Sequence, residues 1–427
     1  MTAASRPRTA PRRALVSWCL YDWANSAYPT VILTFVFATY FTQAVATDPI
    51  TGTAHWGFAL TVSGVILAVC SPLLGAVADL TGARKPWLAT FTALSVAATA
   101  TLWYVAPSAA LVPLAMTLVV ISNTTFEFGI VFYNAMLPDL VPPTRIGRLS
   151  GWGWGIGYAG GLVCLVIALF AFVKPDQPPF GLVKANAEHV RAAALLTAAW
   201  FAVFSLPILL WTPDRPSRHV PLRRAVPEGI RALARTLRDI RHHRDVATYL
   251  VAQMIYTDGL NTLFAFGGIY AAGTFSMSLE QVLMFGIALN VTAGIGAFVF
   301  AWIDDWIGSK ATIAMGLVAV TVLGAAILLV DTQQEFWILG LGLGVFFGPI
   351  QSASRSLMAH LAPEQRRTEM FGLYALTGKA TAFLGPMVLG WATLAFDSQR
   401  AGMATILAFF VTGLALLLRV PDPRRHA

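Results

Sequence analysis

Charged residues are scarce in this sequence. Only 12% of its 427 residues are Asp, Glu, Lys or Arg, whereas 57% are hydrophobic. A soluble protein of this size needs more polar surface, so the composition excludes a soluble globule and, with a mean hydropathy of +0.67, indicates an integral membrane protein. Cysteine is also rare: Cys19, Cys70 and Cys164 show no paired spacing, so neither a disulfide framework nor a metal site is expected.

Long apolar runs fill most of the chain, and a membrane-spanning helix needs about 20 such residues. We therefore predict an all-α integral membrane protein with twelve transmembrane helices in two six-helix halves. The halves are residues 14–211 and 245–420, joined by a basic linker, 212–244, and flanked by tails 1–13 and 421–427. The predicted spans are 14–44, 57–79, 87–106, 109–137, 149–173, 192–211, 246–274, 281–303, 311–330, 335–361, 369–396 and 401–419.

The positive charges follow the order of the loops. Most of the 29 Lys and Arg residues fall in alternate loops and in the tails, and cations concentrate on the cytoplasmic side of a membrane. We therefore expect both termini in the cytoplasm and the protein in the cell (inner) membrane. This distribution also argues against nucleic-acid binding, despite a net charge of +8. The first run is too long for the core of a cleaved signal peptide.

A polar motif recurs in the two halves. Asp22 and Asn25 lie on one helix face inside the first run, and Asp258 and Asn261 repeat the pair early in the seventh run. A charged side chain at mid-bilayer costs about 2.5 to 3.5 kcal/mol on insertion scales and normally marks a functional path. The repeat therefore predicts two related halves with polar groups facing a central cavity.

A second motif recurs in the loops after the second and eighth runs. Each copy has an acid, a glycine three residues later and a cation two residues beyond that glycine, a tight turn able to brace a neighbouring helix when one side of the protein is closed. We expect a conformational gate formed by Gly75, Asp79, Gly82, Arg84, Lys85, Asp305, Gly308 and Lys310.

These turns, with six plus six helices, resemble the major facilitator superfamily. More specifically, the chain is similar to the branch of the autophagy-related vacuolar amino-acid effluxers. The similarity rests on Tyr21 to Tyr28, Tyr133 to Pro138, Gly151 to Gly161, Gln351 to Ser356 and Phe371 to Tyr374. The resemblance implies a monomer that works by rocking its halves about a midplane site, a small-metabolite substrate with amino acids favoured, and export rather than import.

The resemblance also implies that helices one, four, seven and ten line the cavity, and the polar residues fall mainly on those helices. The predicted substrate or proton path comprises Asp22, Asn25, Asn123, Glu127, Asp258, Asn261, Gln351, Arg355 and Lys379. Tyr21, Trp23 and Tyr28 are candidates to stack on substrate in the cavity, although aromatic residues within a span are more often packing.

Two chemistries are open for these groups. Asp22 and Asp258 can approach across the cavity, so that one carries a proton. Alternatively, a carboxylate binds a substrate ammonium while Arg355 or Lys379 binds the substrate carboxylate. A purely structural role, in which these residues only hold helices together, is the third possibility.

The linker predicts one more helix. Pro227 is expected to open it, as in a helix lying on an anionic cytoplasmic leaflet. Its apolar stripe is Ile230, Leu233, Leu237 and Ile240, and the arginines around the stripe are Arg231, Arg235, Arg238 and Arg241. No phosphate-binding loop is present, so we expect no cofactor, no enzymatic activity, and transport driven by an ion gradient or by the substrate gradient. A drug or sugar carrier of the same fold and a transporter-like receptor that moves nothing are the alternatives.

Overall fold

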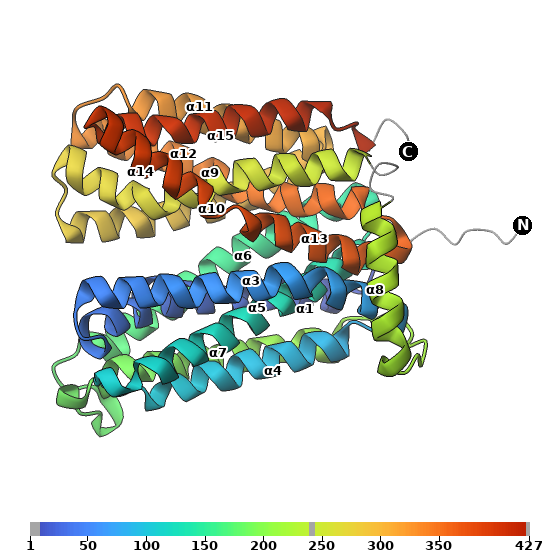
Figure 1. The fold of residues 1–427 in the computed structure, drawn as a ribbon, viewed down its shortest axis with the longest axis horizontal. Helices are drawn as coiled ribbons and strands as arrows, with labels where there is room; N and C mark the ends of the chain where they lie inside the picture. Colours follow the sequence, from blue (N-terminus) through green and yellow to red (C-terminus); the bar gives the residue numbers. More distant parts are fainter. Residues whose placement is uncertain (1–8, 239–243, 424–427) are drawn as a thin grey trace, which may run out of the picture.

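The computed structural model describes residues 9–238 and 244–423. Within these ranges the chain is helical, and the long helices run roughly antiparallel in two groups (Figure 1). The α-helices longer than one turn are α1 (Arg12–Asn25), α3 (Pro49–Thr81), α4 (Lys85–Thr101), α5 (Val112–Leu140), α6 (Ile146–Ile167), α7 (Glu188–Trp211), α8 (Leu222–Arg238), α9 (Arg244–Phe275), α10 (Leu279–Ile307), α11 (Ser309–Ile327), α12 (Gln333–Leu361), α13 (Arg367–Ala380), α14 (Leu384–Phe396) and α15 (Gln399–Arg419).

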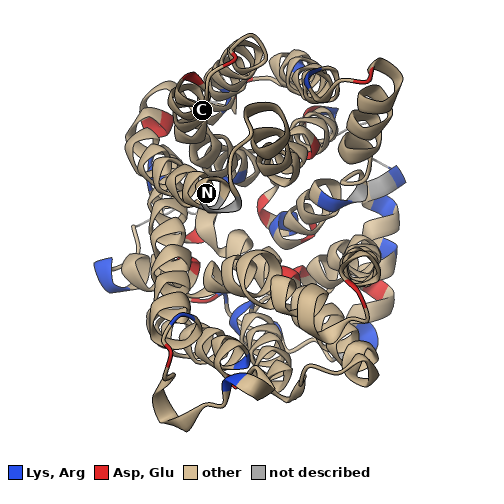
Figure 2. Ribbon diagram, turned by 90° about the vertical axis from the view of Figure 1, so that its left-hand side faces the viewer, with Lys and Arg blue, Asp and Glu red and all other residues tan. Residues whose placement is uncertain are grey.

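The helices match the twelve predicted spans in order. Ten segments of the described chain are long and apolar enough to cross a membrane. Outside that group are α4, which has 17 residues, and α9, which has 32 residues but carries the polar residues Asp258 and Asn261 in its middle. Both run beside the other helices of their halves, α4 against α5 and α7, and α9 against α15. The chain therefore has the predicted twelve-helix fold of two halves. Figure 2 looks along the spans, and most of the ribbon is tan, the colour of residues other than Lys, Arg, Asp and Glu.

One end of the bundle is marked by the start of α1, the end of α15 and helix α8, which lies across the spans (Figure 1). Helix α8 begins at Leu222, five residues before the predicted start, and Pro227 lies inside it. The helix begins earlier than predicted because Pro221 provides the first carbonyl acceptor, for the N–H groups of Arg224 and Ala225.

Helix α8 meets the protein through a face of small residues. Its small residues Ala225 and Gly229 pack on α3, next to Val77. Ile230 of the predicted apolar stripe is exposed. The last predicted turn of this helix, with Ile240 and Arg241, lies outside the described residues.

Two spans are irregular where they approach the centre. The first span changes from α1 to a π-helical segment, Tyr28–Phe35, whose first turn contains Pro29. The eleventh span is broken between α13 and α14. Pro386 lies in the first turn of α14, where its missing N–H is tolerated, but in one continuous helix its ring would clash with the carbonyl of Ala382. Such interruptions are often found at functional sites in membrane proteins.

Candidate transport cavity and gate

A cavity of about 870 Å³ lies between the halves. It extends from mid-span residues such as Ser26 and Gln351 to residues such as Phe35 and Phe336, near the end of the bundle opposite α8. Its wall is mostly apolar, with Leu263, Phe264, Leu343 and Phe347 among the lining side chains. The polar lining groups include Thr30, Trp154, Tyr158, Asn261, Asn290, Gln351 and Lys379.

An ion pair between the halves lies at this cavity. Lys379 in the last turn of α13 lines the wall, and its Nζ is 2.9 Å from Oε1 of Glu127 on α5. The Lys379 side chain is 42% exposed and that of Glu127 is 17% exposed. An acid and a base that are paired but partly accessible can separate, and the acid can then bind the ammonium group of a zwitterion while the base binds its carboxylate.

A second ion pair between the halves is buried and does not line the cavity. Nη1 of Arg355 on α12 is 3.1 Å from Oδ2 of Asp22 on α1. The same Asp22 oxygen accepts a hydrogen bond of 2.8 Å from the Tyr133 hydroxyl. Arg355 also donates to Ser150 of α6. This network pins α1, α5, α6 and α12 together, as the structural interpretation of Asp22 requires.

The two repeated aspartates therefore have separate partners. Oδ2 of Asp258 accepts a hydrogen bond of 3.2 Å from the Gly385 N–H at the start of α14, whereas Asp22 pairs with Arg355. The predicted carboxylate pair across the cavity does not form in this structure. The reason is that the two acids face different helices: Asp22 faces α6 and Arg355 of α12, whereas Asp258 faces the start of α14.

The remaining path residues divide between cavity and packing. Asn261, Gln351 and Lys379 line the cavity. Asn25 donates to Asp22 over 3.4 Å, and Asn123 donates to Ser63 of α3 over 2.9 Å. Neither of these asparagines is among the described residues of the cavity wall.

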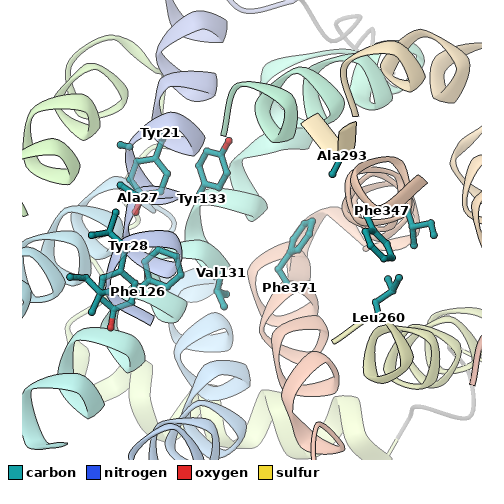
Figure 3. Close-up of a cluster of buried hydrophobic side chains, with 14 of the residues drawn as sticks. Tyr21, Ala27, Tyr28, Phe126, Val131, Tyr133, Leu260, Ala293, Phe347 and Phe371 are labelled. Carbon is teal, nitrogen blue, oxygen red and sulfur yellow. The ribbon is translucent and has the colours of Figure 1, made fainter. Parts of the chain in front are cut away.

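The predicted aromatic stacking residues pack between helices. The Tyr21 hydroxyl bonds to Thr92 over 2.9 Å, the Tyr28 hydroxyl bonds to Ser122 over 2.7 Å, and Trp23 stacks on Trp200. Figure 3 shows Tyr21 and Tyr28 with Phe126 and Tyr133 in a buried cluster of the N-terminal half. In this structure none of the three is among the described residues of the cavity wall, because their side chains pack against helices of their own half.

The cavity instead uses aromatic residues that the sequence reasoning missed. Trp154 and Tyr158 of α6, Phe264 of α9 and Phe347 of α12 contribute to its wall. The first two lie within the glycine-rich stretch of the fifth span, where small residues let α6 approach α1 closely. That stretch was the available sequence signal for them.

The first gate loop closes the α8 end of the bundle. Oδ2 of Asp79 accepts the Glu369 N–H at the start of α13, over 2.9 Å. Nε of the buried Arg84 donates to Oγ1 of Thr368 on α13, over 2.9 Å. A Cβ on Gly75 would lie 2.4 Å from the Thr368 carbonyl oxygen, so only glycine permits this approach of α3 to α13.

The linker strengthens this contact. Asp139 at the end of α5 pairs with Arg84 at 2.6 Å, with Arg215 of the linker at 2.8 Å and with Arg367 of α13 at 2.5 Å. Gly82 adopts a φ of +90° in the turn, and the Lys85 Nζ donates to the Thr212 carbonyl over 2.8 Å. Residues of both halves and of the linker thus converge on one carboxylate.

The second gate loop makes the related contact with α6. Oδ1 of Asp305 accepts the Arg148 N–H over 3.0 Å, and its Oδ2 is 3.2 Å from the Arg148 Nε. Gly308 turns the chain with a φ of +99°. Lys310 does not cross between the halves: its Nζ donates to carbonyls at the end of α15.

Comparisons with known proteins agree with this architecture. The family described as "Vacuole effluxer Atg22 like" matches residues 49–426. The chain is 28% identical to an uncharacterised MFS-type transporter, YxiO, of Bacillus subtilis, over 95% of this chain and 94% of that protein. It is 23% identical to autophagy-related protein 22 of Yarrowia lipolytica over 65% of this chain, and the match spans about half (51%) of the length of that fungal protein.

Solved structures share the fold. The proton:xylose symporter XylE superposes with a TM-score of 0.75 at 14% identity, covering 96% of both chains. FucP in an outward conformation gives a TM-score of 0.74 at 13% identity, covering 96% of this chain and 98% of that chain. At these identities the likeness concerns the major facilitator architecture.

Proposed function

Because the chain belongs to the family of Atg22-like vacuole effluxers, we propose that it is a secondary transporter that exports an amino acid across the cell membrane by alternating access. The class of transporter follows from the relatives, which are MFS-type transporters rather than enzymes. The amino-acid substrate, the outward direction and coupling to protons are the parts that we propose.

One observation supports the amino-acid substrate best: the partly exposed Glu127–Lys379 pair at a mostly apolar cavity. Lys379 can bind the carboxylate of an amino acid while Glu127 binds its ammonium, and the side chain then faces Phe264, Phe347 and Leu343. A lining of this kind favours amino acids with apolar side chains. Substrate binding would also replace a bond between the halves, which links occupancy to the conformational change.

The orientation is part of the proposal. With both termini and α8 in the cytoplasm, the contacts of Asp79 and Asp305 close the cytoplasmic side and the cavity opens outward. Helix α8, with Arg231, Arg235 and Arg238, would then lie at the anionic headgroups of the inner leaflet. We also propose that the working unit is a monomer, because the two halves of one chain form both sides of the cavity.

Uptake and counterflow of a panel of labelled amino acids in proteoliposomes test this function. We expect several amino acids with apolar side chains to exchange, and we expect Glu127→Gln and Lys379→Gln each to reduce exchange by about tenfold or more, because each loses a charge-assisted bond of about 1.5 to 3 kcal/mol.

Lys184→Gln is the matched control. Its ammonium pairs with Asp176 in an exposed loop, and neither residue is among the described residues of the cavity wall. Exchange of no amino acid by the native chain would contradict the proposal and would favour a drug or sugar substrate or a receptor. Exchange at the native rate by both Glu127→Gln and Lys379→Gln would show that the substrate binds elsewhere.

A further inference from the structure

We infer that Asp258 is the proton-binding residue of the transport cycle and that its protonation controls the junction between α13 and α14. This inference rests on the proposed function, since it names the group that couples transport to protons. It differs from the expectation that Asp22 and Asp258 share a proton, because the two carboxylates have separate partners.

The first observation is an unpartnered buried oxygen. Asp258 is only 2% exposed, yet its Oδ1 has no hydrogen-bond partner among the described residues. That oxygen is directed at the start of α14, since a Cβ on Gly385 would lie 3.0 Å from it. Buried carboxylate oxygens without a partner are costly and uncommon, so this one calls for a ligand.

The second observation is the lack of a counter-charge. The other two acids of the predicted path have one each, Arg355 for Asp22 and Lys379 for Glu127. No described cation contacts Asp258. The charged side chains on the described parts of the helices packed against α9 are Asp304 and Asp305 of α10, Glu335, Arg355 and His360 of α12, Arg367, Glu369 and Lys379 of α13, and Arg400 and Arg419 of α15, with none on α14.

The repeat makes the difference plain. Asp22 and Asp258 hold corresponding places in the two halves, and each lies against a glycine of a neighbouring helix, Gly153 or Gly385. Only Asp22 also has an arginine and a tyrosine hydroxyl. An isolated ionised carboxylate in a low-dielectric interior is strongly disfavoured, so Asp258 is neutralised by a proton for part of the cycle.

The position of Asp258 connects this proton to the moving parts. Its Oδ2 accepts the N–H of Gly385 in the first turn of α14, where a negative charge is stabilised by the helix dipole. Protonation weakens that attraction. On its α13 side the junction adjoins Lys379, in the last turn of that helix. Lys379 forms the ion pair with Glu127 in the other half. Release or uptake of the proton can therefore alter the contact between the halves.

The packing favours a proton over a metal cation. A Cβ on Gly385 would lie 2.0 Å from Oγ1 of Thr262, and that hydroxyl already donates to the Asp258 carbonyl over 2.8 Å. The space beside Oδ1 is thus closely filled, whereas a sodium or calcium ion needs room for several oxygen ligands. A proton needs only the free oxygen.

Proteoliposomes of the full chain test the role of Asp258. With one proton per substrate, a gradient of about one pH unit supports up to about tenfold accumulation of an exchanged amino acid. We expect the native chain to approach that limit. Asp258→Asn keeps the shape and an acceptor for Gly385 but cannot bind the proton, so we expect accumulation to fall to the level without a gradient while counterflow continues. Asp397→Asn, an exposed acid at the outer end of α14, is the matched control.

The outcomes separate the two proposals. Gradient-driven accumulation by Asp258→Asn equal to native would overturn the role of Asp258, as would accumulation driven by sodium instead of protons. Absence of all amino-acid exchange in the native chain would overturn the proposed function instead.

A measurement on the unaltered chain covers the case in which Asp258→Asn does not fold. A hydrophobic carbodiimide adds to protonated carboxyl groups in apolar surroundings, and mass spectrometry locates the adduct. We expect an adduct at Asp258 that declines as the pH rises, and none at Asp22 or Glu127, which are ion-paired. No adduct at Asp258 at acidic pH would contradict the inference whatever the substrate is.

Discussion

Single residues in the spans are held by partners from distant parts of the chain. The Arg355 guanidinium is surrounded by the rings of Trp18, Tyr133 and Trp154, at 4.8, 5.6 and 5.7 Å from their centroids. Asp22 supplies its counter-charge. A fully buried ion pair adds less to stability than its geometry suggests, but loss of one partner leaves an uncompensated charge in the interior.

Asp22→Asn should therefore destabilise the protein. We expect a loss of about 3 to 5 kcal/mol, because Arg355 then remains charged and buried without its partner. Thermal unfolding in detergent measures the change, with Asp176→Asn in an exposed loop pair as the control. The double variant Asp22→Asn, Arg355→Gln should recover part of the loss. A single variant as stable as the native chain would show that the pair is not the main support of Arg355.

Pairs of helices set how closely the halves meet. Helix α3 contacts α13 through Gly75, and the Ser71 hydroxyl donates to the Gly372 carbonyl of α13 over 2.9 Å. These contacts lie between the gate loop and mid-span, so they close the α8 end of the bundle along two turns of α3. Small residues at such contacts allow backbones to approach in a membrane.

Gly75→Val should keep this end from closing, because a Cβ would meet the Thr368 carbonyl oxygen at 2.4 Å. In a chain without its three cysteines, we expect Thr368→Cys to react with a maleimide several-fold faster when Gly75→Val is added, since Thr368 is fully buried in the closed state. Gly64→Val on the same helix is the control, as nothing lies within 4 Å of its Cβ position. Equal reaction rates with and without Gly75→Val would show that α3 and α13 adjust to the larger side chain.

The whole molecule is held in one state by two related gate contacts. Asp79 caps α13 and Asp305 binds Arg148 at the start of α6, so each half braces a helix of the other half. The proposed alternating access requires both contacts to break together. A shift of about 5.5 kcal/mol is needed to move a two-state equilibrium from 1:99 to 99:1, and two charge-assisted contacts of about 1.5 to 3 kcal/mol each supply a large part of it.

The double variant Asp79→Asn, Asp305→Asn should therefore populate the state open at the α8 end. We expect spin labels on Thr144→Cys and Gln365→Cys, exposed positions in the two halves, to show a longer distance in a larger fraction of molecules than in the native background. Asp397→Asn with the same labels is the control. An unchanged distance distribution would mean that other contacts, such as those of Asp139, keep the gate closed.

The spans and the repeat were available from the sequence because hydropathy and spacing are local properties. All twelve predicted spans overlap helices of the structure in the predicted order, since a helix in a membrane satisfies its own backbone hydrogen bonds wherever the apolar run is long enough. The positions of Asp22 and Asp258 inside those runs, and of the two acid–glycine turns, could be read in the same way. The Gly385-Pro386 dipeptide also indicates a break in the eleventh span, which the prediction of one continuous span did not include.

The tertiary structure alone decided which polar groups meet. Arg355 reaches Asp22 across 333 positions of sequence, and whether Tyr21 and Tyr28 face the cavity or their own half depends on how α1 rotates against α5 and α7. Helix rotation and crossing are set by side-chain packing between segments distant in the chain, so no local pattern specifies them. For the same reason the sequence identified two similar aspartates, but only the tertiary structure decided that one of them contacts an arginine and that no described cation contacts the other.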